Sequence, residues 1–537
     1  MQGTMMNYPL TLAHILERAG KLFPDREVVS RLPDRSLHRC TFGDIYRRAR
    51  ALAAGLQNAG LQRGDRVATL MWNHHAHLEA YFGIPVSGGV MHTLNLRLAP
   101  REIAYIAQHG GARFLILDQL LLPIYEQIKD AANFERVFVV ISGGTDLPRE
   151  AENYESLVSV DASNFRYPQI DENEAASLCY TSGTTGLPKG VAYTHRSIFL
   201  HTFLLTTADN FAICHQDVSL PVVSMFHVNG WGLPYAAALV GCKLVLPGPY
   251  LDAPSLLELC EQEKVTVAAG VPTIWLNVVD CLERNPGRWK LPKMRVLVGG
   301  AAPPLALIRK LRGYGINLHQ GWGLTESSPQ ATTNQLKAHM KDWPADQLDE
   351  VCAKAGIPVP LVDMRVVNEA GEVAHDDQTL GEVQLRGPWV ASSYYNLPEE
   401  KNKWTDDGWF RTGDVGTVDA EGYLKIADRT KDLIKSGGEW ISSVDLENAL
   451  VAHPDVREAA VVAVPHPKWQ ERPLAVVVAR EGAHPTSEAL RQFLSDKFAK
   501  WQLPDSFVFV DELPHTSTGK LLKTELRKRY QDWRWDS

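Results

Sequence analysis

The sequence has few cysteines, and none of them is spaced as a metal-binding or disulfide pair. Its 537 residues include seven cysteines, at positions 40, 179, 214, 242, 260, 281 and 352. There is no Cys-x-x-Cys motif, and no pair of histidines lies near any of them. This scatter argues against a zinc site and a disulfide framework and is typical of reduced thiols in a protein core. It predicts a cytoplasmic protein.

The sequence also lacks a long apolar run. A membrane-spanning helix needs about 18 consecutive apolar residues, and Lys243 interrupts the longest candidate, Leu233 to Leu246. Met1 to Ala19 carries no basic region ahead of its short apolar stretch, so it does not match a secretory signal. We therefore expect no transmembrane segment and no exported precursor.

An excess of positive charge is missing as well. The 55 Lys and Arg residues are outnumbered by 63 Asp and Glu residues, which gives a net charge of −8. This balance argues against non-specific nucleic-acid binding but leaves a local anion site open. With 45% hydrophobic and 22% charged residues, the composition is that of an ordinary globular protein. The length exceeds what one hydrophobic core usually holds, so several domains are expected.

Short apolar runs alternate with helical periodicity through most of the chain. Pro100 to His109 has a helical pattern and is followed by Gly110-Gly111, a helix stop signal. Strand–helix alternation predicts α/β layers with mostly parallel sheets. The expected strands are Arg66 to Met71, Phe114 to Leu117, Val137 to Ile141, Val265 to Ala269 and Arg295 to Val298.

The pattern changes towards the C-terminus. Gly381 to Arg386 and Gly422 to Ile426 read as strands on either side of the turn-rich segment Asp407 to Gly413, which predicts a small β-rich subdomain. After the charged junction Asp428 to Asp432, a small α+β domain is expected. Its helices are Val444 to Ala452 and Glu488 to Trp501, and its strands are Ala459 to Val464, Leu474 to Val478 and Phe507 to Val510. The predicted domains are residues 1–429 and 430–537.

The most informative segment is Tyr180 to Gly190, with the sequence YTSGTTGLPKG. Apolar runs on both sides indicate a loop between two strands. Its glycines let backbone N–H groups converge on an anion, while hydroxyl groups and a lysine add donors and charge. The ordinary P-loop has Ser or Thr after the lysine, but here Gly190 follows it. The candidate phosphate ligands are Thr181, Ser182, Gly183, Thr184, Thr185, Gly186 and Lys189.

This loop resembles, without a mismatch, the signature loop of the AMP-forming adenylating enzymes. That superfamily includes acyl-CoA synthetases, luciferases and the adenylation domains of peptide synthetases. The similarity of pattern runs from about Leu10 to Lys528, nearly the whole chain. The resemblance implies a large N-terminal domain, a small mobile C-terminal domain, ATP and coenzyme A as co-substrates, and Mg²⁺.

Further motifs extend the resemblance to the nucleotide. Trp322 is implied to lie against adenine, where many relatives have Tyr, and Thr325 to contact the α-phosphate. Glu326 is implied to bind Mg²⁺, with Thr181 completing the site. Gly299 follows an expected strand, and its segment is predicted to present N–H groups at a helix start. The other implied nucleotide ligands are Gly300, Ala301, Gln320, Gly321, Asp414 and Arg429, the last two at the ribose.

The resemblance also assigns residues in the small domain. Lys520, in the late Thr-Ser-Thr-Gly-Lys segment, matches the adenylation lysine of the family. Lys431 matches the hinge about which the small domain rotates, a position that is Asp or Lys in relatives. Lys435 and Trp440 are implied to contact the nucleotide, and coenzyme A is implied to contact Gly437, Gly438 and Trp440.

The acyl site is expected around Met225 to Trp231. His227 matches an aromatic position beside the substrate carboxylate, and Trp231 matches the gate tryptophan of a bacterial long-chain fatty acyl-CoA synthetase. Packed core is the alternative interpretation of Trp231. Val228 and Gly323 complete the implied substrate site, and the implied catalytic residues are Lys189, His227, Glu326 and Lys520.

The chemistry explains this choice of residues. A carboxylate is already ionised at neutral pH, so its attack on the α-phosphate needs charge neutralisation rather than a general base. The resemblance points to an acyl-CoA synthetase for a medium- or long-chain fatty acid, or to a methylmercaptopropionyl-CoA ligase. A luciferase-like enzyme and a carrier-loading enzyme are further alternatives. A non-catalytic nucleotide-binding protein is disfavoured because Lys189 and Lys520 are both present. The choice between monomer and homodimer stays open.

Overall fold

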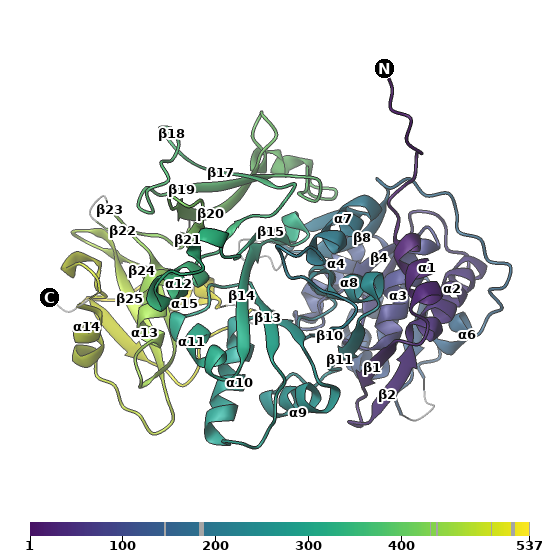
Figure 1. Ribbon diagram of the computed structural model, residues 1–537, viewed down its shortest axis with the longest axis horizontal. Helices are drawn as coiled ribbons and strands as arrows, with labels where there is room; N and C mark the ends of the chain where they lie inside the picture. The colour runs from purple at the N-terminus through teal and green to yellow at the C-terminus, as the bar shows by residue number, and fades with distance from the viewer. Residues whose placement is uncertain are drawn as a thin grey trace.

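Two large, mostly parallel sheets form the N-terminal part of the protein (Figure 1). The structure is a computed structural model that describes residues 1–143, 147–181, 187–429, 431–436, 439–495, 497–516 and 521–535. Among these residues, no helix combines the length and the apolar character needed to cross a membrane.

The first large sheet has seven strands, of which β8 and β9 form an antiparallel hairpin while the other pairings are parallel. Its order is β7 (Ala151–Asn153), β6 (Arg136–Val140), β5 (Ala112–Asp118), β3 (Arg66–Leu70), β4 (Val90–Thr93), β8 (Ala175–Tyr180) and β9 (Gly190–Thr194). The helices along this stretch of chain are α2 (Phe42–Asn58), α3 (His75–Val86), α4 (Pro100–His109), α5 (Leu122–Ala132), α6 (Glu155–Val158) and α7 (His195–Leu205).

The second large sheet has nine strands, parallel from β1 to β14 across its middle and antiparallel at both edges. Its order is β16 (Ile357–Pro358), β15 (Gln330–Thr333), β14 (Ile316–Gly323), β13 (Met294–Val298), β12 (Val267–Gly270), β10 (Val218–Pro221), β11 (Lys243–Leu246), β1 (Glu27–Arg31) and β2 (Leu37–Thr41). Its helices are α1 (Leu12–Leu22), α8 (Leu233–Val240), α9 (Ala253–Glu263), α10 (Pro272–Arg284), α11 (Leu305–Gly313) and α12 (Ala345–Cys352).

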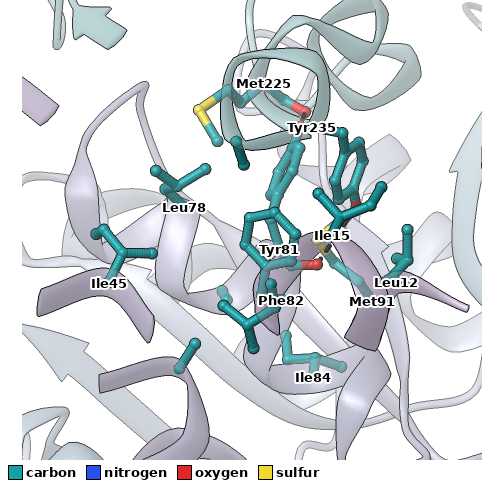
Figure 2. Close-up of a cluster of buried hydrophobic side chains, with 14 of the residues drawn as sticks. Leu12, Ile15, Ile45, Leu78, Tyr81, Phe82, Ile84, Met91, Met225 and Tyr235 are labelled. Atoms are coloured by element: carbon teal, nitrogen blue, oxygen red, sulfur yellow. Dashed lines mark hydrogen bonds between the residues drawn. The ribbon is translucent and has the colours of Figure 1, made fainter. Parts of the chain in front are cut away.

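One hydrophobic core joins the two sheets. Side chains of α1, α2, α3 and α8 pack there with residues from strands of both sheets, such as Phe114 and Leu244. Figure 2 shows the part in which Tyr81 and Tyr235 meet Met225. The Tyr81 hydroxyl donates to the Met225 carbonyl, so the core also fixes the start of the predicted acyl segment. Burying each such large side chain stabilises the fold by about 2 kcal/mol.

Two smaller sheets follow in sequence. An antiparallel sheet has the order β18 (Gly371–Glu372), β17 (Asp363–Asn368), β19 (Gly381–Arg386), β20 (Phe410–Val418) and β21 (Leu424–Arg429). The last sheet pairs β23 (Glu439–Ile441), β22 (Ile434–Ser436), β25 (Gln470–Ala479) and β24 (Val456–His466), with β26 (Ser506–Phe509) parallel to β25. Helices α13 (Ser443–Val451), α14 (Ser487–Ser495) and α15 (Lys523–Arg529) belong to this C-terminal part.

The α/β fold with a small β-rich sheet and a C-terminal α+β part is the predicted one. Strand β19 and helix α4 have the predicted bounds. The segment Asp407 to Gly413 was predicted to be turn-rich throughout. This needs correction, because β20 already begins at Phe410. Helix α14 ends at Ser495, earlier than predicted. In Figure 1 the C-terminal part, in yellow, lies at one end of the molecule beside α10 and α11, where Arg480 forms a 3.1 Å ion pair with Asp280 of α10.

The cysteine prediction needs a partial correction. All seven cysteines are free thiols, but only Cys179, Cys242 and Cys260 are buried, and Cys214 is exposed. Burial raises the pKa of Cys242 and Cys260, which keeps these thiols protonated and unreactive. In the described part of the chain, no cluster of three or more His, Cys, Asp or Glu side chains could hold a metal ion.

Candidate active site

The predicted phosphate loop joins β8 to β9. Its central residues, Ser182, Gly183, Thr184, Thr185 and Gly186, lie outside the described residues. At the two ends of the loop, Thr181 N–H donates to the Lys189 carbonyl over 2.9 Å, and Lys189 N–H donates to the Thr181 hydroxyl over 3.1 Å. These two hydrogen bonds extend the pairing of β8 and β9 by one residue on each strand. The Thr181 and Lys189 side chains both line the same cavity.

Lys189 is held by a carboxylate and an aromatic ring. Its ammonium lies 2.5 Å from a carboxylate oxygen of Glu400, and both side chains are about one-quarter exposed, at 23% and 27%. Glu400 belongs to a 3₁₀ helix, η5 (Pro398–Lys403). The same ammonium lies 5.2 Å from the ring centre of Tyr394, within range of a cation–π interaction. Lys189 is therefore paired at the place where phosphate is expected.

Glu326, the predicted magnesium ligand, lies next to this pair in the short 3₁₀ helix η3 (Thr325–Ser327). It is 8% exposed, and its Oε1 accepts a 2.5 Å hydrogen bond from the Tyr394 hydroxyl. Burial and the neighbouring Glu326 charge raise the pKa of Tyr394, so the phenol stays protonated and donates. Tyr193 fixes η3 from β9, because its hydroxyl donates to the Thr325 carbonyl over 2.6 Å.

Trp322, Asp414 and Arg429 form the next group. The Trp322 indole nitrogen donates to Asp414 Oδ2 over 2.9 Å, and Arg429 Nε lies 3.2 Å from the other oxygen. Asp414 on β20 pairs directly with Arg429 on β21. The antiparallel register thus brings Asp414 and Arg429 together, and the indole hydrogen bond adds Trp322 from β14 of another sheet. Asp428, at the start of the expected charged junction, is a buried residue near the end of β21.

Glycines bring backbone close to the cavity at two places. A Cβ on Gly323 would lie 1.7 Å from the Pro329 carbonyl oxygen, so only glycine fits there. A Cβ on Gly299 would lie 3.0 Å from the Gly321 carbonyl and 3.2 Å from the Trp231 ring. The Gly299 segment follows β13, as expected, and leads to α11, which begins at Leu305 with Pro304 at its N-cap. Whether its N–H groups bind the nucleotide stays a prediction.

The predicted acyl segment forms an unusual turn. In η2 (Val228–Gly232) all five residues have left-handed φ angles, between 45° and 77°. L-residues adopt this conformation at an energetic cost. Anchors surround the turn: Asn229 Oδ1 accepts from the Ser177 hydroxyl over 3.0 Å, and Asn73 accepts from Met225 N–H over 2.7 Å. The turn brings His227, Val228 and Trp231 to the cavity, with Trp231 only 8% exposed.

These groups line one continuous cavity of about 400 Å³. Its lining includes the polar groups Thr181, Lys189, Thr325, Glu326 and Arg429, and also His227, Val228 and Trp231 with aliphatic side chains. A second cavity, of about 290 Å³, shares Gly300, Gly321, Trp322, Gly323 and Arg429 with the first. Its wall also includes Ala301, Gln320, Asp414, Lys431 and Thr516.

The C-terminal part reaches this second cavity through one of its two predicted segments. Thr516 lines it, and the four residues that follow, up to Lys520, lie outside the described residues, as do Gly437 and Gly438. Lys435 and Trp440 line neither cavity. Trp440 is 43% exposed on β23, with the Lys435 ammonium 5.5 Å from its ring centre. The structure thus places the start of the Thr-Ser-Thr-Gly-Lys segment at a cavity and leaves Lys435 and Trp440 away from both cavities.

Three site residues were not predicted from the sequence. Tyr394 and Glu400 contact Lys189 and Glu326 from a segment more than two hundred positions after the phosphate loop. His201 on α7 lines the first cavity beside Trp231. No local motif marks any of the three, because each contributes through a long-range contact.

Comparison with known proteins identifies the family. The model of the AMP-binding enzyme family matches residues 16–395, and that of the AMP-binding enzyme C-terminal domain matches residues 445–520. The chain belongs to the AMP-binding enzymes. This confirms the predicted membership of the AMP-forming adenylating superfamily.

Relatives of this AMP-binding enzyme match it along almost its full length. A long-chain-fatty-acid–CoA ligase of Thermus thermophilus is 51% identical over 99% of this chain and 97% of its own. A 3-methylmercaptopropionyl-CoA ligase of Ruegeria pomeroyi is 43% identical over 99% of both chains. Among solved structures, the anthranilate CoA ligase AuaEII in complex with anthranoyl-AMP has a TM-score of 0.86 at 25% identity, covering 97% of this chain and 98% of its own.

Proposed function

We propose that this AMP-binding enzyme is an ATP-dependent acyl-CoA synthetase. A carboxylic acid and ATP would give an acyl-adenylate and pyrophosphate, and coenzyme A would then give acyl-CoA and AMP. The observation that carries this proposal is one cavity whose lining combines the cations Lys189 and Arg429 with many apolar side chains. Relatives named as CoA ligases support the same conclusion.

In the first step, a carboxylate oxygen of the acid attacks the α-phosphorus, and pyrophosphate leaves. The acid is ionised at neutral pH, so no side chain has to remove a proton. The residues instead reduce repulsion between two anions: Lys189 at the phosphates, Arg429 beside the nucleotide, and Lys520 as the proposed adenylation lysine. His227 and Trp231 would orient the acid with its chain away from the phosphates.

The residues around Glu326 suit magnesium. Glu326 supplies a carboxylate and Thr181 a hydroxyl on the wall that also carries Lys189. One carboxylate and a hydroxyl, together with phosphate oxygens and water, form a donor set that Mg²⁺ accepts. When bound, the ion would neutralise part of the phosphate charge. Tyr394 holds Glu326 in place through its hydrogen bond.

For the second step, the coenzyme A sulfur attacks the acyl carbonyl carbon, and AMP leaves. We propose that residues 430–537 form a small domain that turns about Lys431 between the two steps. Thr516 is at the second cavity while Lys435 and Trp440 are away from both, which supports an arrangement suited to adenylation. Rotation would exchange the Lys520 segment for Gly437, Gly438 and Trp440.

The half-reactions test this rotation. Lys520→Ala should lower adenylate formation by about a hundredfold or more, because a charged group at the reacting phosphate is lost. Thioester formation from presynthesised acyl-adenylate should stay close to wild type. Equal loss of both half-reactions would contradict a lysine that serves only the first step.

The acid is proposed to be a medium- or long-chain fatty acid. The second candidate, methylmercaptopropionate, is supported by the names of two Ruegeria relatives at 42% and 43% identity. An assay with ATP, Mg²⁺, coenzyme A and acids from propionate to palmitate, with methylmercaptopropionate and cinnamate, tests the proposal. AMP release without thioester, from every acid, would overturn it. Cytoplasmic location and the choice between monomer and homodimer stay predictions.

A further inference from the structure

The lining of the main cavity includes an arginine that no sequence motif predicted. Arg97 lies on the segment between β4 and α4 and lines this cavity. The residue is exposed, so a ligand in the cavity can reach it. Burial nevertheless lowers the pKa of Arg97, although a guanidinium stays charged at physiological pH. A side chain that is surrounded by protein and still reached by solvent belongs to a cavity and not to the outer surface.

The order of the strands brings the Arg97 segment beside the phosphate loop. Strand β4 is a parallel neighbour of β8, which leads into that loop. Near the ends of the two strands, the Thr93 hydroxyl and the Cys179 sulfur lie 3.6 Å apart. Arg97 and Thr181 follow these two residues directly along their chains. Segments that follow adjacent parallel strands meet at the carboxyl edge of a sheet, which is where α/β proteins bind their ligands.

Contacts on both sides hold the Arg97 segment against the phosphate hairpin. The preceding residue, Leu96, is buried in a hydrophobic cluster against which Tyr180, the last residue of β8, also packs. Helix α4 follows the segment, and Nδ1 of its last residue, His109, forms a 2.7 Å hydrogen bond with the Tyr180 hydroxyl. The segment is therefore tied at both ends to the strand that enters the phosphate loop.

An aromatic ring lies beside the Arg97 guanidinium. Arg97 Cζ is 5.9 Å from the ring centre of Trp72, within range of a cation–π interaction. Trp72 follows β3, the other neighbour of β4, and its N–H donates to Asp118 over 2.8 Å. The planar guanidinium has five N–H donors, which match phosphate oxygens in pairs. Arg97 thus has the charge, the donors and the position that a phosphate ligand requires.

We propose that Arg97 binds the β- and γ-phosphates of ATP together with Lys189 and stabilises pyrophosphate as it leaves. This rests on the proposed acyl-CoA synthetase function. As the acyl oxygen bonds to the α-phosphorus, the bond to the bridging oxygen breaks and its electron pair goes to pyrophosphate. A cation beside pyrophosphate stabilises the charge that develops there. Glu400 neutralises part of the Lys189 charge, so Arg97 supplies further positive charge for the phosphates.

The test compares two nucleotides that differ only in these phosphates. Calorimetry of the full chain measures the Kd of ATP with Mg²⁺, in the absence of any acid, and the Kd of AMP. In Arg97→Gln the Kd of ATP should rise about tenfold, because a charge-assisted contact is lost, while the Kd of AMP stays within about twofold. The inhibition constant of inorganic pyrophosphate should rise about tenfold as well. Arg97→Lys, which keeps the charge without the planar donors, should fall between the two.

Arg101→Gln is the matched control. Arg101 is exposed on the first turn of α4 and is not among the described residues that line the two cavities, so both Kd values should stay at wild type. An unchanged Kd for ATP in Arg97→Gln, or an equal rise for ATP and AMP, would overturn the inference. Unchanged AMP binding also shows that the variant is folded. Failure of the wild type to form acyl-CoA from any acid would instead overturn the proposed function, so the two failures are distinguishable.

Discussion

The two ends of the main cavity are held by different kinds of interaction. At the nucleotide end, charged and polar side chains from distant elements pair with one another: Lys189 with Glu400, Glu326 with Tyr394, and Asp414 with both Trp322 and Arg429. At the acyl end, backbone conformation and packing dominate, in the left-handed turn Val228–Gly232.

This difference predicts how each end responds to change. In the proposed mechanism, paired charges at the nucleotide end hold their side chains in place before ATP binds and act on the phosphates, which every acid uses in the same way. The acyl end would act through the shape of its wall, which would distinguish one acid from another. A substitution at the nucleotide end should therefore change kcat/KM by the same factor for every acid. A substitution at the acyl end should change which acid the enzyme prefers.

The largest effect is expected at Lys189. Lys189→Met removes a cation from the predicted phosphate site, so kcat/KM should fall by about a hundredfold for every acid. The ratios between acids should stay within about twofold of wild type. Steady-state kinetics with three acids of different length measures both quantities. Lys189→Arg, which keeps the charge, is the control, and a reordered acid preference in Lys189→Met would break the comparison.

A smaller, selective effect is expected at Trp231. Trp231→Phe shortens the aromatic side chain and enlarges the wall while keeping an apolar ring. kcat/KM should change by about tenfold between acids of different length, because one methylene is worth about 1–3 kcal/mol in an apolar pocket. KM for ATP should hardly move. Unchanged kinetics with every acid would assign Trp231 to the packed core instead of the substrate wall.

Local sequence patterns predicted the helices and strands better than the tertiary contacts between them. The phosphate loop was expected between two strands, and β8 and β9 lie on either side of it. Alternation over Gly381–Arg386 predicted β19 with its bounds. Such patterns depend on neighbours in sequence. The Gly299 segment was likewise expected between a strand and a helix, and β13 and α11 lie on either side of it.

The contacts within the site depend on the tertiary fold. Glu400 and Tyr394 reach Lys189 only because the segment after β19 folds back over the hairpin; its Tyr395 N–H donates to the Gly190 carbonyl. The left-handed run in η2 needs the anchors Asn73 and Ser177, which come from other elements. His201 looks like any helix residue until Gly232 fixes its ring. None of these contacts leaves a periodic trace in the sequence.

A modest effect at the nucleotide end is expected from Glu400. Its carboxylate forms an ion pair with Lys189 and would compete with the phosphates that Lys189 is proposed to bind. Glu400→Gln should therefore lower KM for ATP by about threefold, as for a partly exposed ion pair. KM for the acid should not change. Glu399→Gln is a matched control, since it removes the same charge from the exposed neighbouring residue. A raised KM for ATP in Glu400→Gln alone would mean that Glu400 orients Lys189 instead of competing for it.

The smallest effect is expected at Lys431, which lines the second cavity. Burial, with Arg429, Arg527 and Lys403 nearby, lowers its pKa to about 8 although Asp414 partly opposes this. The folded state therefore holds fewer protons than the unfolded state between about pH 8 and the ordinary lysine pKa near 10.4. Stability linked to this group is lowest below pH 8 and rises through that window.

Lys431→Met removes the partly buried charge and with it this pH dependence. The variant should melt a few degrees above the wild type near pH 7, and the difference should shrink as the pH approaches about 10. Thermal unfolding of both proteins across this range measures it. Lys435→Met, at an exposed lysine on β22, should show no such convergence. A constant difference for Lys431→Met would mean that Lys431 stays protonated throughout this pH range and that its pKa is not lowered in the folded state.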